Sequence, residues 1–463
     1  MKKIRLAAGL GFYGDNWEPI RAAIEFGEVN YVCSDHLAEL TLAILRKDQA
    51  RDPAAGFTRD LVPMLSALWP MAQQAGVKFV LNAGGLNPGG ARDALLAAFK
   101  AKGWTARIAV VTGDALLDHI DDLRAQGQDL AHLDTAAPID EVHERLVFAN
   151  AYLGAAPIVE ALASGADIVL TGRVADAALF LAPLIHEFGW SLQPGDAEGW
   201  SRLAQGLCVG HLLECSGQGA GGNFGSAGAW QKVPDLTHIG YPIAEVFENG
   251  SAIITKAPGT GGRINFHTVR QQLLYEVHNP QRYLSPDVVL DMSTIQLDEL
   301  GGNRVRLRGA SGSAPPATLK LVAGYENGWM GSAVLGFCWP DAMAKARAVV
   351  ASIKTQMDEK RMRHEELHVE FLGHDSFLGP HADSTREAEL NEVWLRMAVR
   401  ASDKRVADAF PRLFPWMALS GPPFMGGFHG IQPASQLLGL WPSQVARELI
   451  EPLVKVELSE VQP

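Results

Sequence analysis

The sequence predicts an α/β protein with a Rossmann-like parallel sheet at its N-terminus, helices on both faces of that sheet, and an α+β second domain. Over residues 1–195, short apolar runs alternate with helical patterns, which is typical of parallel strands joined by crossover helices. Beyond that point, hairpin signals and separate helices replace the alternation. The chain has 463 residues, more than one ordinary core covers. We therefore expect two domains, residues 1–195 and 196–463, which complete a cleft between them.

The first predicted domain contains five strands, each a short apolar run: Ile4–Ala8, Val29–Cys33, Val77–Leu81, Ala106–Val111 and Asp167–Leu170. Helical patterns lie between them, and the clearest are Glu18–Phe26, His36–Leu45 and Leu61–Gln74. The sequence Gln193-Pro194-Gly195-Asp196 then interrupts the alternation, because Pro-Gly favours a turn. We place the domain boundary there.

The second predicted domain is a mixture of helices and hairpins. The segments Thr318–Gly324 and Trp329–Gly336 flank Glu326-Asn327-Gly328, and Asn-Gly between two apolar runs predicts a β-hairpin. A short apolar strand also precedes a lysine and a glycine-rich loop. The helices predicted in this domain are Trp200–Cys215, Asp341–Met357 and Thr385–Arg400.

The composition suits a globular protein, with 47% hydrophobic and 20% charged residues. The formal net charge of −12 and the pI near 5.6 argue against nucleic acid or an anionic membrane as a partner, because both select a basic face. The four cysteines form no CxxC pair, which fits a reducing cytoplasm. The N-terminus lacks the apolar run of a signal peptide, and no segment approaches the ~20 apolar residues that span a bilayer. We expect a cytoplasmic protein.

Each predicted strand ends in glycine or polar residues, and the carboxyl ends of parallel strands share the edge of a sheet where ligands bind. Asp35 and Asp114 are candidate catalytic acid/base residues at this edge, and Arg173 is a candidate clamp for a carboxylate or phosphate. The alternative for the aspartates is helix capping, and the alternative for Arg173 is a pair with Asp176. The candidate binding residues at this edge, with the asparagines as oxyanion donors or turn residues, are Gly11, Asn82, Gly84, Gly85, Asn87, Arg173 and Asp176.

The segment Thr255–Gly262 places Lys256 at the end of a short apolar strand, directly before a glycine-rich loop. Backbone amides, a hydroxyl and an ammonium group therefore lie within a few residues of one another, which suits an anionic oxygen. The lysine precedes the glycines, so this is not a Walker loop. We predict that Lys256 is catalytic and holds a phosphate, carboxylate or enolate, with Gly259, Thr260 and Gly261 as binding residues. The alternative is a tight turn flanked by a lysine.

His211 and Glu214 lie three residues apart on the predicted helix that ends at Cys215, beside a loop that holds Asn223. We assign the two as candidate catalytic acid/base residues and Asn223 as a candidate binding residue. The side chains of His211, Glu214, Cys208 and Cys215 are all of types that can bind a metal ion. Cysteines in an apolar helix are usually core residues, however, so no metal site is predicted.

The motif Gly9-x-Gly11-x-x-Gly14 follows a strand and precedes a helix, as a dinucleotide-binding fingerprint would, and Asp35 lies at the next strand end. Asp15 and Glu18 oppose this interpretation, because acidic side chains at a helix N-terminus would repel a pyrophosphate. A turn that lines some other ligand is therefore favoured over NAD(P) or FAD. The sequence also lacks a Gly-x-Ser-x-Gly elbow and a His-Glu-x-x-His motif, which removes two large hydrolase classes.

An ordered set of blocks along essentially the whole chain resembles the AtuA family, named for acyclic terpene utilisation in bacteria. The matching blocks are Gly11-Phe12-Tyr13-Gly14-Asp15, Leu37-Ala38-Glu39-Leu40-Thr41, Asn82-Ala83-Gly84-Gly85-Leu86-Asn87-Pro88, Thr171-Gly172-Arg173-Val174-Ala175-Asp176-Ala177, Gly210-His211-Leu212-Leu213-Glu214-Cys215, Thr255-Lys256-Ala257-Pro258-Gly259-Thr260-Gly261-Gly262, Gln272-Leu273-Leu274-Tyr275-Glu276-Val277 and Ser420-Gly421-Pro422-Pro423. The resemblance implies catabolism of branched or terpenoid acids as coenzyme A thioesters, and it transfers no catalytic residue.

This chain departs from the family pattern at two points. An arginine that is common after the Gly-Asp pair is Asn16, which weakens any anion clamp at that turn. Many relatives also carry a further C-terminal ferredoxin-like segment, and this chain stops without it. The resemblance therefore implies a separately encoded small ferredoxin-like-fold partner.

Together these observations predict a catabolic enzyme that acts on a branched or terpenoid acyl-CoA, or a related carboxylate, by hydratase- or lyase-type chemistry. The substrate is expected to be a small anion, with coenzyme A as a part of it and no other firm cofactor. Two alternatives stay open: an NAD(P)-dependent oxidoreductase that uses Gly9–Gly14, and a non-catalytic subunit that scaffolds an acyl-CoA-processing complex. We also expect a homo-oligomer.

Overall fold

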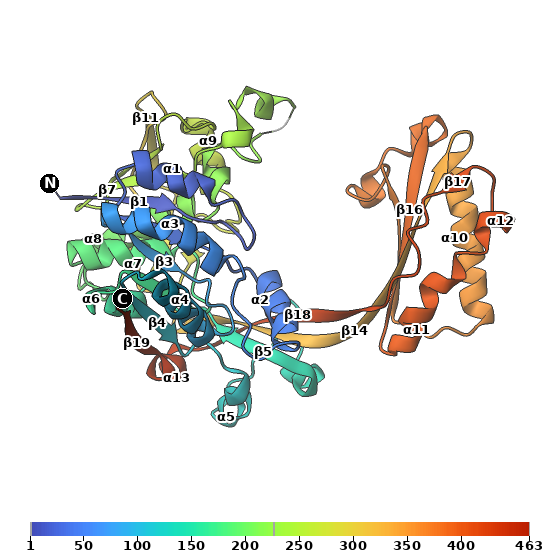
Figure 1. Ribbon diagram of the computed structural model, residues 1–463, viewed down its shortest axis with the longest axis horizontal. Helices are drawn as coiled ribbons and strands as arrows, with labels where there is room; N and C mark the ends of the chain where they lie inside the picture. The colour runs from blue at the N-terminus through green and yellow to red at the C-terminus, as the bar shows by residue number, and fades with distance from the viewer. Residues whose placement is uncertain (1, 226, 463) are drawn as a thin grey trace. The chain divides into compact units, whose positions relative to one another are not determined.

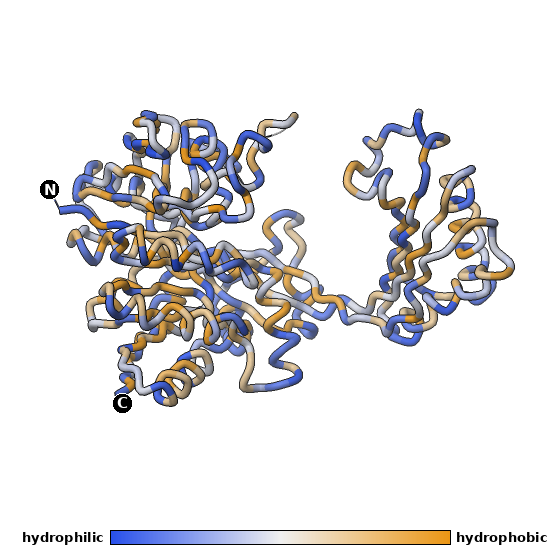
Figure 2. Tube along the Cα trace, turned by 45° about the horizontal axis from the view of Figure 1, so that its top comes forward, coloured by the Kyte–Doolittle hydropathy of each residue, from blue (hydrophilic) through white to orange (hydrophobic). Residues whose placement is uncertain are grey.

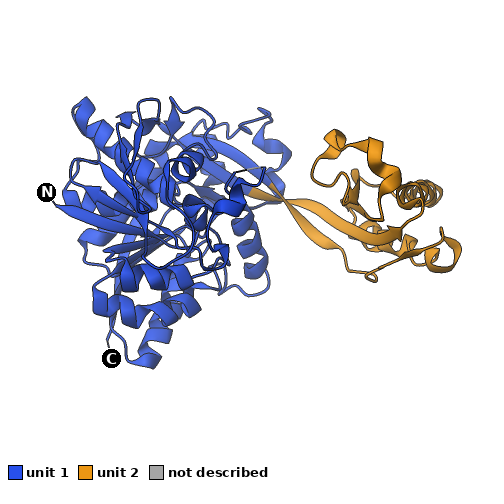
Figure 3. Cartoon of the chain, turned by 90° about the horizontal axis from the view of Figure 1, so that it is seen from above, with its two compact units in different colours: residues 1–323, 440–463 blue, residues 324–439 orange. Residues whose placement is uncertain are grey.

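The computed structural model describes residues 2–225 and 227–462, and the chain divides into two compact units. Unit 1 comprises residues 1–323 and 440–463, and unit 2 comprises residues 324–439 (Figure 3). Unit 1 is built around a ten-stranded sheet and unit 2 around an antiparallel sheet. In the part of the chain that the structure describes, no helix is both long and apolar enough to cross a membrane.

The centre of unit 1 is a mixed sheet with the strand order β11-β12-β8-β7-β1-β2-β3-β6-β4-β19 (Figure 1). Its parallel strands are β1 (Lys3–Ala8), β2 (Tyr31–Ser34), β3 (Lys78–Leu81), β6 (Ile168–Thr171) and β4 (Ala106–Thr112). These are the five predicted strands, with ends shifted by at most two residues. β2 and β6 are buried along their whole length, as expected of parallel strands covered on both faces. The predicted α/β fold with a Rossmann-like parallel core is confirmed.

Strands from the second half of the chain extend the same sheet. β7 (Pro242–Phe247) is antiparallel to β1, and β8 (Ala252–Lys256) is antiparallel to β7. β8 therefore runs in the direction of β1, and Lys256 ends at the edge where the parallel strands end. The outer strands of the sheet are β12 (Val305–Arg308), β11 (Gln296–Glu299) and β19 (Lys455–Val461).

The division into compact units does not coincide with the predicted domain boundary at 195/196. The units divide after residues 323 and 439. The reason is that the chain beyond residue 195 supplies β7, β8, β12 and β11 to the sheet that begins with β1, and so shares its core.

Helices cover both faces of this sheet (Figure 1). They are α1 (Glu18–Phe26), α2 (Glu39–Gln49), α3 (Leu61–Ala75), α4 (Pro88–Lys102), α6 (Ala156–Ala163), α7 (Ala178–Phe188) and α8 (Ala197–Leu213). α3 packs against α1 and α4, whereas α7 packs against α6 and α8. The first eight residues of α7 are all buried, which explains its almost uninterrupted apolar sequence. The helices predicted at 18–26 and 61–74 are confirmed, and those predicted at 36–45 and 200–215 form with ends shifted by two to four residues.

The remaining elements of unit 1 pack around this sheet or join its strands. Hydrophobic residues concentrate along the strands of the interior (Figure 2). The remaining elements are α5 (Ile120–Ala125), β5 (Leu146–Ala151), α9 (Phe266–Leu273), α13 (Arg447–Ile450), and the small antiparallel sheet of β13 (Ser311–Ser313), β10 (Val289–Asp291) and β9 (Tyr283–Leu284).

Unit 2 is an antiparallel sheet with one long helix packed on its buried face. Its elements are β14 (Thr318–Cys338), α10 (Ala342–Glu359), β15 (Glu366–Leu372), β16 (Glu392–Ala401), α11 (Lys404–Ala409), α12 (Met417–Ser420), β17 (Met425–Gly426) and β18 (Ser435–Ala446); β14 begins in unit 1 and β18 ends there. Along β16 every second residue is buried, so Leu395, Met397 and Val399 share one face. That face forms the core with Val349 and Ile353 of α10.

The predicted hairpin at 318–336 is wrong, because this segment is the single 21-residue strand β14. β14 pairs with β16 and β17 and also with β5 and β18, so its backbone finds partners without folding back on itself. Gly328, which suggested the turn, has a φ of +82°. A Cβ at that position would lie 2.7 Å from the carbonyl oxygen of Ala401. The lack of a side chain at Gly328 therefore lets β14 and β16 approach closely at this point.

The predicted helix Thr385–Arg400 is also wrong over most of its length. Residues 384–389 form a short 3-10 helix, and β16 begins at Glu392. The apolar side chains of 393–401 recur at every second residue, which is the period of a strand. The helix predicted at 341–357 is confirmed as α10.

Candidate functional site

A cavity of about 840 Å³ lies at the carboxyl edge of the parallel strands in unit 1. Its walls include the loops that follow β1, β2 and β6, the turn after α8, and the segment before β7. This is the edge at which open parallel sheets bind ligands. Residues from both sides of the predicted 195/196 boundary line the cavity, and all of them belong to unit 1.

The structure separates the predicted site residues into three groups. Those that line the cavity are Gly11, Asp35, Arg173, Asp176, Glu214 and Asn223. Those buried behind it, each hydrogen-bonded to a lining residue, are Asn82, Asp114 and His211. Those outside the lining are Gly84, Gly85, Asn87, Lys256, Gly259, Thr260 and Gly261.

Asp35 is a buried carboxyl at the end of β2. Asn82 Nδ2 donates to its Oδ1 at 2.5 Å, and the backbone N–H of Leu37 donates to the same oxygen at 3.1 Å. Burial raises the pKa of Asp35 well above its usual value, and the charge of Asp176 raises it further, while Arg173 and Asn82 oppose the rise. Asn82 therefore positions a carboxyl group in this structure, and its own Oδ1 is occupied by the N–H of His36 at 2.6 Å.

Glu214 follows α8 and pairs with His211 one turn earlier. Nδ1 of His211 lies 2.9 Å from Oε1 of Glu214, and Nε2 of His211 lies 3.2 Å from the carbonyl oxygen of Leu273. Burial raises the pKa of Glu214 to about 7, although the charge of His211 opposes the rise. Burial alone would lower the pKa of His211, but the charge of Glu214 and these hydrogen bonds raise it overall. Glu214 Oε2 is buried without a hydrogen-bond partner.

Arg173 is a buried cation at the end of β6. Its Nη1 donates to Asp176 Oδ1 at 2.7 Å and to the carbonyl oxygen of Val174 at 3.0 Å. Its guanidinium carbon lies 4.0 Å from the ring centroid of Tyr152, a cation–π contact. Arg173 therefore forms the predicted alternative pair with Asp176, and both residues line the cavity.

Asp114 supports Arg173 from behind the cavity. The backbone N–H of Arg173 donates to Asp114 Oδ2 at 2.7 Å, and Asn150 Nδ2 donates to the same oxygen at 2.7 Å. Burial raises the pKa of Asp114 to about 6 against these hydrogen bonds. Gly172 permits the close approach, because a Cβ there would lie 2.4 Å from both carboxylate oxygens. Asp114 holds the loop of the site and does not itself line the cavity.

Three further residues line this wall that were not predicted from the sequence. Tyr152 donates its hydroxyl to Glu39, whose Oε1 also accepts from Lys320 Nζ at 2.9 Å, and all three residues line the cavity. Lys320 Nζ lies 4.6 Å from the ring centroid of Tyr152. Glu39 stands in one of the blocks that carry the family resemblance, which is the one signal that points to it. Tyr152 directly follows β5 and Lys320 lies on β14, so the pairing of these two strands brings both residues to Glu39.

The Lys256 loop is closed on itself. Lys256 Nζ donates to the carbonyl oxygen of Thr260 at 2.5 Å and to its Oγ1 at 3.2 Å. Gly261 exchanges backbone hydrogen bonds with His238 and Gly240, and a Cβ on it would lie 2.0 Å from the carbonyl oxygen of Asp235. The ammonium group of Lys256 thus bonds to acceptors within its own turn, as expected of a tight turn flanked by a lysine, which was the alternative for this segment. Ile239, which forms an isolated β-bridge with Gly261, lines the cavity, whereas Gly261 does not.

The asparagine loop at 82–90 is also structural outside Asn82. Asn87 Oδ1 caps α4 by accepting from the N–H of Gly90 at 2.9 Å, and its Nδ2 donates to two backbone carbonyl oxygens. Gly85 has a φ of +54°, and a Cβ on Gly84 would lie 2.6 Å from the carbonyl oxygen of Thr171. These residues shape the turn behind the cavity.

The three glycine amides of the Gly9–Gly14 turn already have acceptors. The N–H of Gly11 donates to Asp15 Oδ2 at 3.1 Å, and the N–H of Gly14 donates to Asp60 Oδ2 at 2.9 Å. A pyrophosphate would need these donors and would meet two carboxylates instead. The turn therefore lines the cavity without the geometry of a dinucleotide site. Within residues 2–225 and 227–462, no group of three or more His, Cys, Asp or Glu residues is arranged to hold a metal ion.

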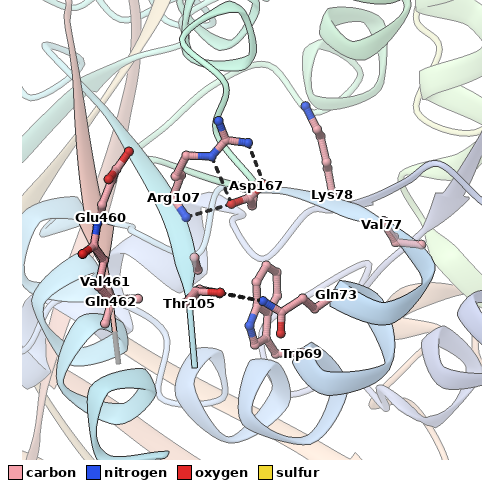
Figure 4. A pocket seen from close by; sticks show the side chains of 12 residues that line it. Trp69, Gln73, Val77, Lys78, Thr105, Arg107, Asp167, Glu460, Val461 and Gln462 are labelled. Carbon is pink, nitrogen blue, oxygen red and sulfur yellow. Dashed lines mark hydrogen bonds and ion pairs between the residues drawn. The ribbon is translucent and has the colours of Figure 1, made fainter. Parts of the chain in front are cut away.

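A different cavity, of about 480 Å³, opens at the amino edge of the same sheet (Figure 4). Four of its polar side chains bond in pairs, since Arg107 pairs with Asp167 at 3.2 Å and Gln73 donates to Thr105 Oγ1 at 2.9 Å. It lies at the edge that parallel sheets do not use for ligands. We therefore place the candidate site at the carboxyl edge.

A comparison with family models gave one match, described as acyclic terpene utilisation family protein AtuA, over residues 4–456. Comparisons with curated proteins and with solved structures gave no match. The matched range includes every residue that lines the candidate site and all of unit 2. The chain belongs to the AtuA family, which is linked to acyclic terpene utilisation.

Proposed function

We propose that this protein is a catabolic acid–base enzyme that hydrates, or by the reverse reaction dehydrates, a branched or terpenoid acyl-CoA or a related carboxylate. The observation that carries the proposal is the presence of two carboxyl groups with raised pKa, Asp35 and Glu214, in one cavity. Titratable groups moved toward neutral pH are suited to proton transfer. The family link to acyclic terpene utilisation supports the class of acyl chain.

Arg173 and Lys320 bring two positive charges to a cavity that many carboxyl groups line, including Asp15 and Glu276. Arg173 pairs with Asp176 and Lys320 pairs with Glu39, so these four residues contribute no net charge. The raised pKa of Asp35 favours its neutral form, and the pKa of Glu214, raised to about 7, leaves both its neutral and its ionised form populated at neutral pH. A neutral carboxyl group repels an anion far less than an ionised one.

The two carboxyl groups suit the two proton transfers of hydration. Ionised Glu214 takes a proton from water as the water oxygen bonds to the β-carbon of the enoyl group. The electrons of the double bond move toward the carbonyl oxygen, and the resulting enolate takes a proton at its α-carbon from neutral Asp35. The charge of Arg173 stabilises the enolate oxygen. Dehydration follows the same steps in reverse.

The test is an assay of the full chain with branched enoyl-CoA thioesters and the corresponding free acids. Hydration is followed by loss of absorbance of the conjugated thioester, and exchange of the α-proton in D₂O is followed by mass spectrometry. Glu214→Gln and Asp35→Asn are each expected to lower the rate by roughly 10²–10⁴-fold. The exposed Glu25 on α1 supplies the matched control, Glu25→Gln, which should leave the rate unchanged. Neither hydration nor exchange with any of these compounds, or full activity in Glu214→Gln, would refute the proposal.

A further inference from the structure

A third cavity, polar and of about 370 Å³, lies in unit 1 beside the first turns of α8. It is bounded by α8, by the turn between β7 and β8, and by β12. Glu214 follows the other end of α8, so the two cavities lie at opposite ends of one 17-residue helix. This third cavity takes no part in the proposed acid–base chemistry.

Three arginines meet at this cavity. Arg202 lies on the face of α8 that also carries Gln205 three residues later. Arg306 and Arg308 alternate along β12 with the buried Val305 and Leu307, so both extend to the same side of the sheet. The cavity lining therefore brings together guanidinium groups from a helix and a strand that are about a hundred residues apart in the sequence.

The positive charge is not fully compensated. Arg202 pairs with Glu198 at 3.2 Å, and Arg308 pairs with Asp298 at 3.2 Å, both in exposed positions. Among the ion pairs of the described residues, none includes Arg306. A protein with a net charge of −12 thus carries a local excess of positive charge in a concave site. Such an arrangement attracts a small anion.

A buried donor in the same wall lacks an acceptor. Gln205 is 5% exposed, and its Oε1 accepts from the backbone N–H of Ala310 at 3.0 Å. That bond fixes the amide, and Nε2 is left buried without a hydrogen-bond partner. A buried N–H without an acceptor is unfavourable, so an oxygen of a ligand in this cavity would stabilise the site.

We propose that this cavity binds a phosphate-type oxyanion, either inorganic phosphate or the phosphoryl group of a small metabolite. Arg306 supplies the unpaired charge, Arg202 and Arg308 flank it, and Gln205 Nε2 donates to a phosphate oxygen. Guanidinium groups match tetrahedral oxyanions because their N–H groups form two parallel hydrogen bonds to a pair of oxygens. The volume of about 370 Å³ suits a phosphoryl group with a small organic part.

The test is a titration of the full chain with inorganic phosphate and with glycerol 3-phosphate, by calorimetry and thermal unfolding, at an ionic strength matched with sodium chloride. We expect a saturable heat and a rise in Tm. Arg306→Gln should weaken affinity by about tenfold or more. Gln205→Glu keeps an acceptor for Ala310 but replaces the N–H by an oxygen, so it should weaken binding as strongly. Tighter binding of the ester than of phosphate identifies a metabolite site, and the reverse identifies a site for free phosphate.

Two controls separate this site from general effects and from the acid–base cavity. Arg282→Gln removes an exposed arginine elsewhere in unit 1 and should leave phosphate affinity unchanged. Glu214→Gln should also leave it unchanged, whatever its effect on turnover. The proposal is overturned by the absence of saturable binding above the chloride control, by wild-type affinity in Arg306→Gln and Gln205→Glu, or by loss of binding in Glu214→Gln.

Discussion

His211 Nδ1 and Glu214 Oε1 lie 2.9 Å apart and hold one proton between them. Nε2 of the histidine faces the carbonyl oxygen of Leu273, which only accepts, so Nε2 carries a hydrogen. The proton between Nδ1 and Oε1 then belongs either to an imidazolium or to a carboxylic acid. The pair is buried, and Glu214 lines the cavity whereas His211 does not. His211 is thus a positioning residue that sets the charge of Glu214.

Replacing His211 by glutamine should raise the pKa of Glu214 above about 7, because the positive charge that opposes the effect of burial is removed. If ionised Glu214 is the base, activity rises with pH through its pKa, and the acid limb of the kcat/KM profile should move to higher pH. The profile of Glu25→Gln is the reference. A variant that loses activity equally at every pH would show that His211 acts only on folding or geometry.

Asp114 should make the folded protein less stable as pH rises. Its pKa is raised to about 6 in the folded state, above the ordinary value near 3.9, so the folded protein binds the proton more tightly than the unfolded chain does. That stabilisation is present at low pH and is lost as pH rises through about 6. Between about pH 5 and pH 8, the free energy of unfolding of Asp114→Asn should therefore rise relative to that of the wild type by about 1.5 kcal/mol, with the rest of the effect lying below pH 5. Urea unfolding at both pH values measures the difference, and a constant difference would contradict the assignment.

Gly172→Ala should destabilise unit 1, because its Cβ would lie 2.4 Å from both oxygens of Asp114. Overlap of this kind costs about 1–3 kcal/mol, and it would also push Arg173 out of place. Gly195→Ala is the matched control, since a Cβ there meets nothing within 4 Å and Gly195 does not have a positive φ. Chemical denaturation of both variants gives the comparison. Equal stability of the two would mean that the Gly172–Asp114 contact relaxes freely.

Lys256→Met should lower the free energy of unfolding by about 1–3 kcal/mol, because Thr260 loses a charged hydrogen-bond partner. Ligand affinity in the acid–base cavity should stay unchanged, since Lys256 does not line it. Lys232→Met, at an exposed position, controls for the loss of charge. The opposite pattern, with stability retained and ligand binding lost, would restore the anion-binding interpretation of the loop.

The parallel core was predictable because buried strands are read as continuous apolar runs that end in glycine or polar residues. That pattern located β1, β2, β3, β4 and β6 and placed Asp35 and Arg173 at one edge. Residues 393–401 have the period of a strand, so the helix predicted there is wrong. The hairpin predicted from Asn327-Gly328 is wrong for another reason. Neighbouring strands offer hydrogen-bond partners along the whole of β14, so the chain stays extended in spite of the turn sequence.

The sequence by itself determined the class of fold and the family, and it predicted the edge of the candidate site and the residues whose chemistry suits proton transfer. Only the tertiary structure decided which of them face the cavity. Asp35 and Glu214 line it, whereas Asn82, Asp114 and His211 stand behind it and Lys256 bonds to its own loop. It also added Tyr152 and Lys320, brought together by β5 and β14. Residue spacing describes neighbours along the chain, but burial and charge depend on contacts between segments distant in sequence, and these set both the exposure and the pKa of each group.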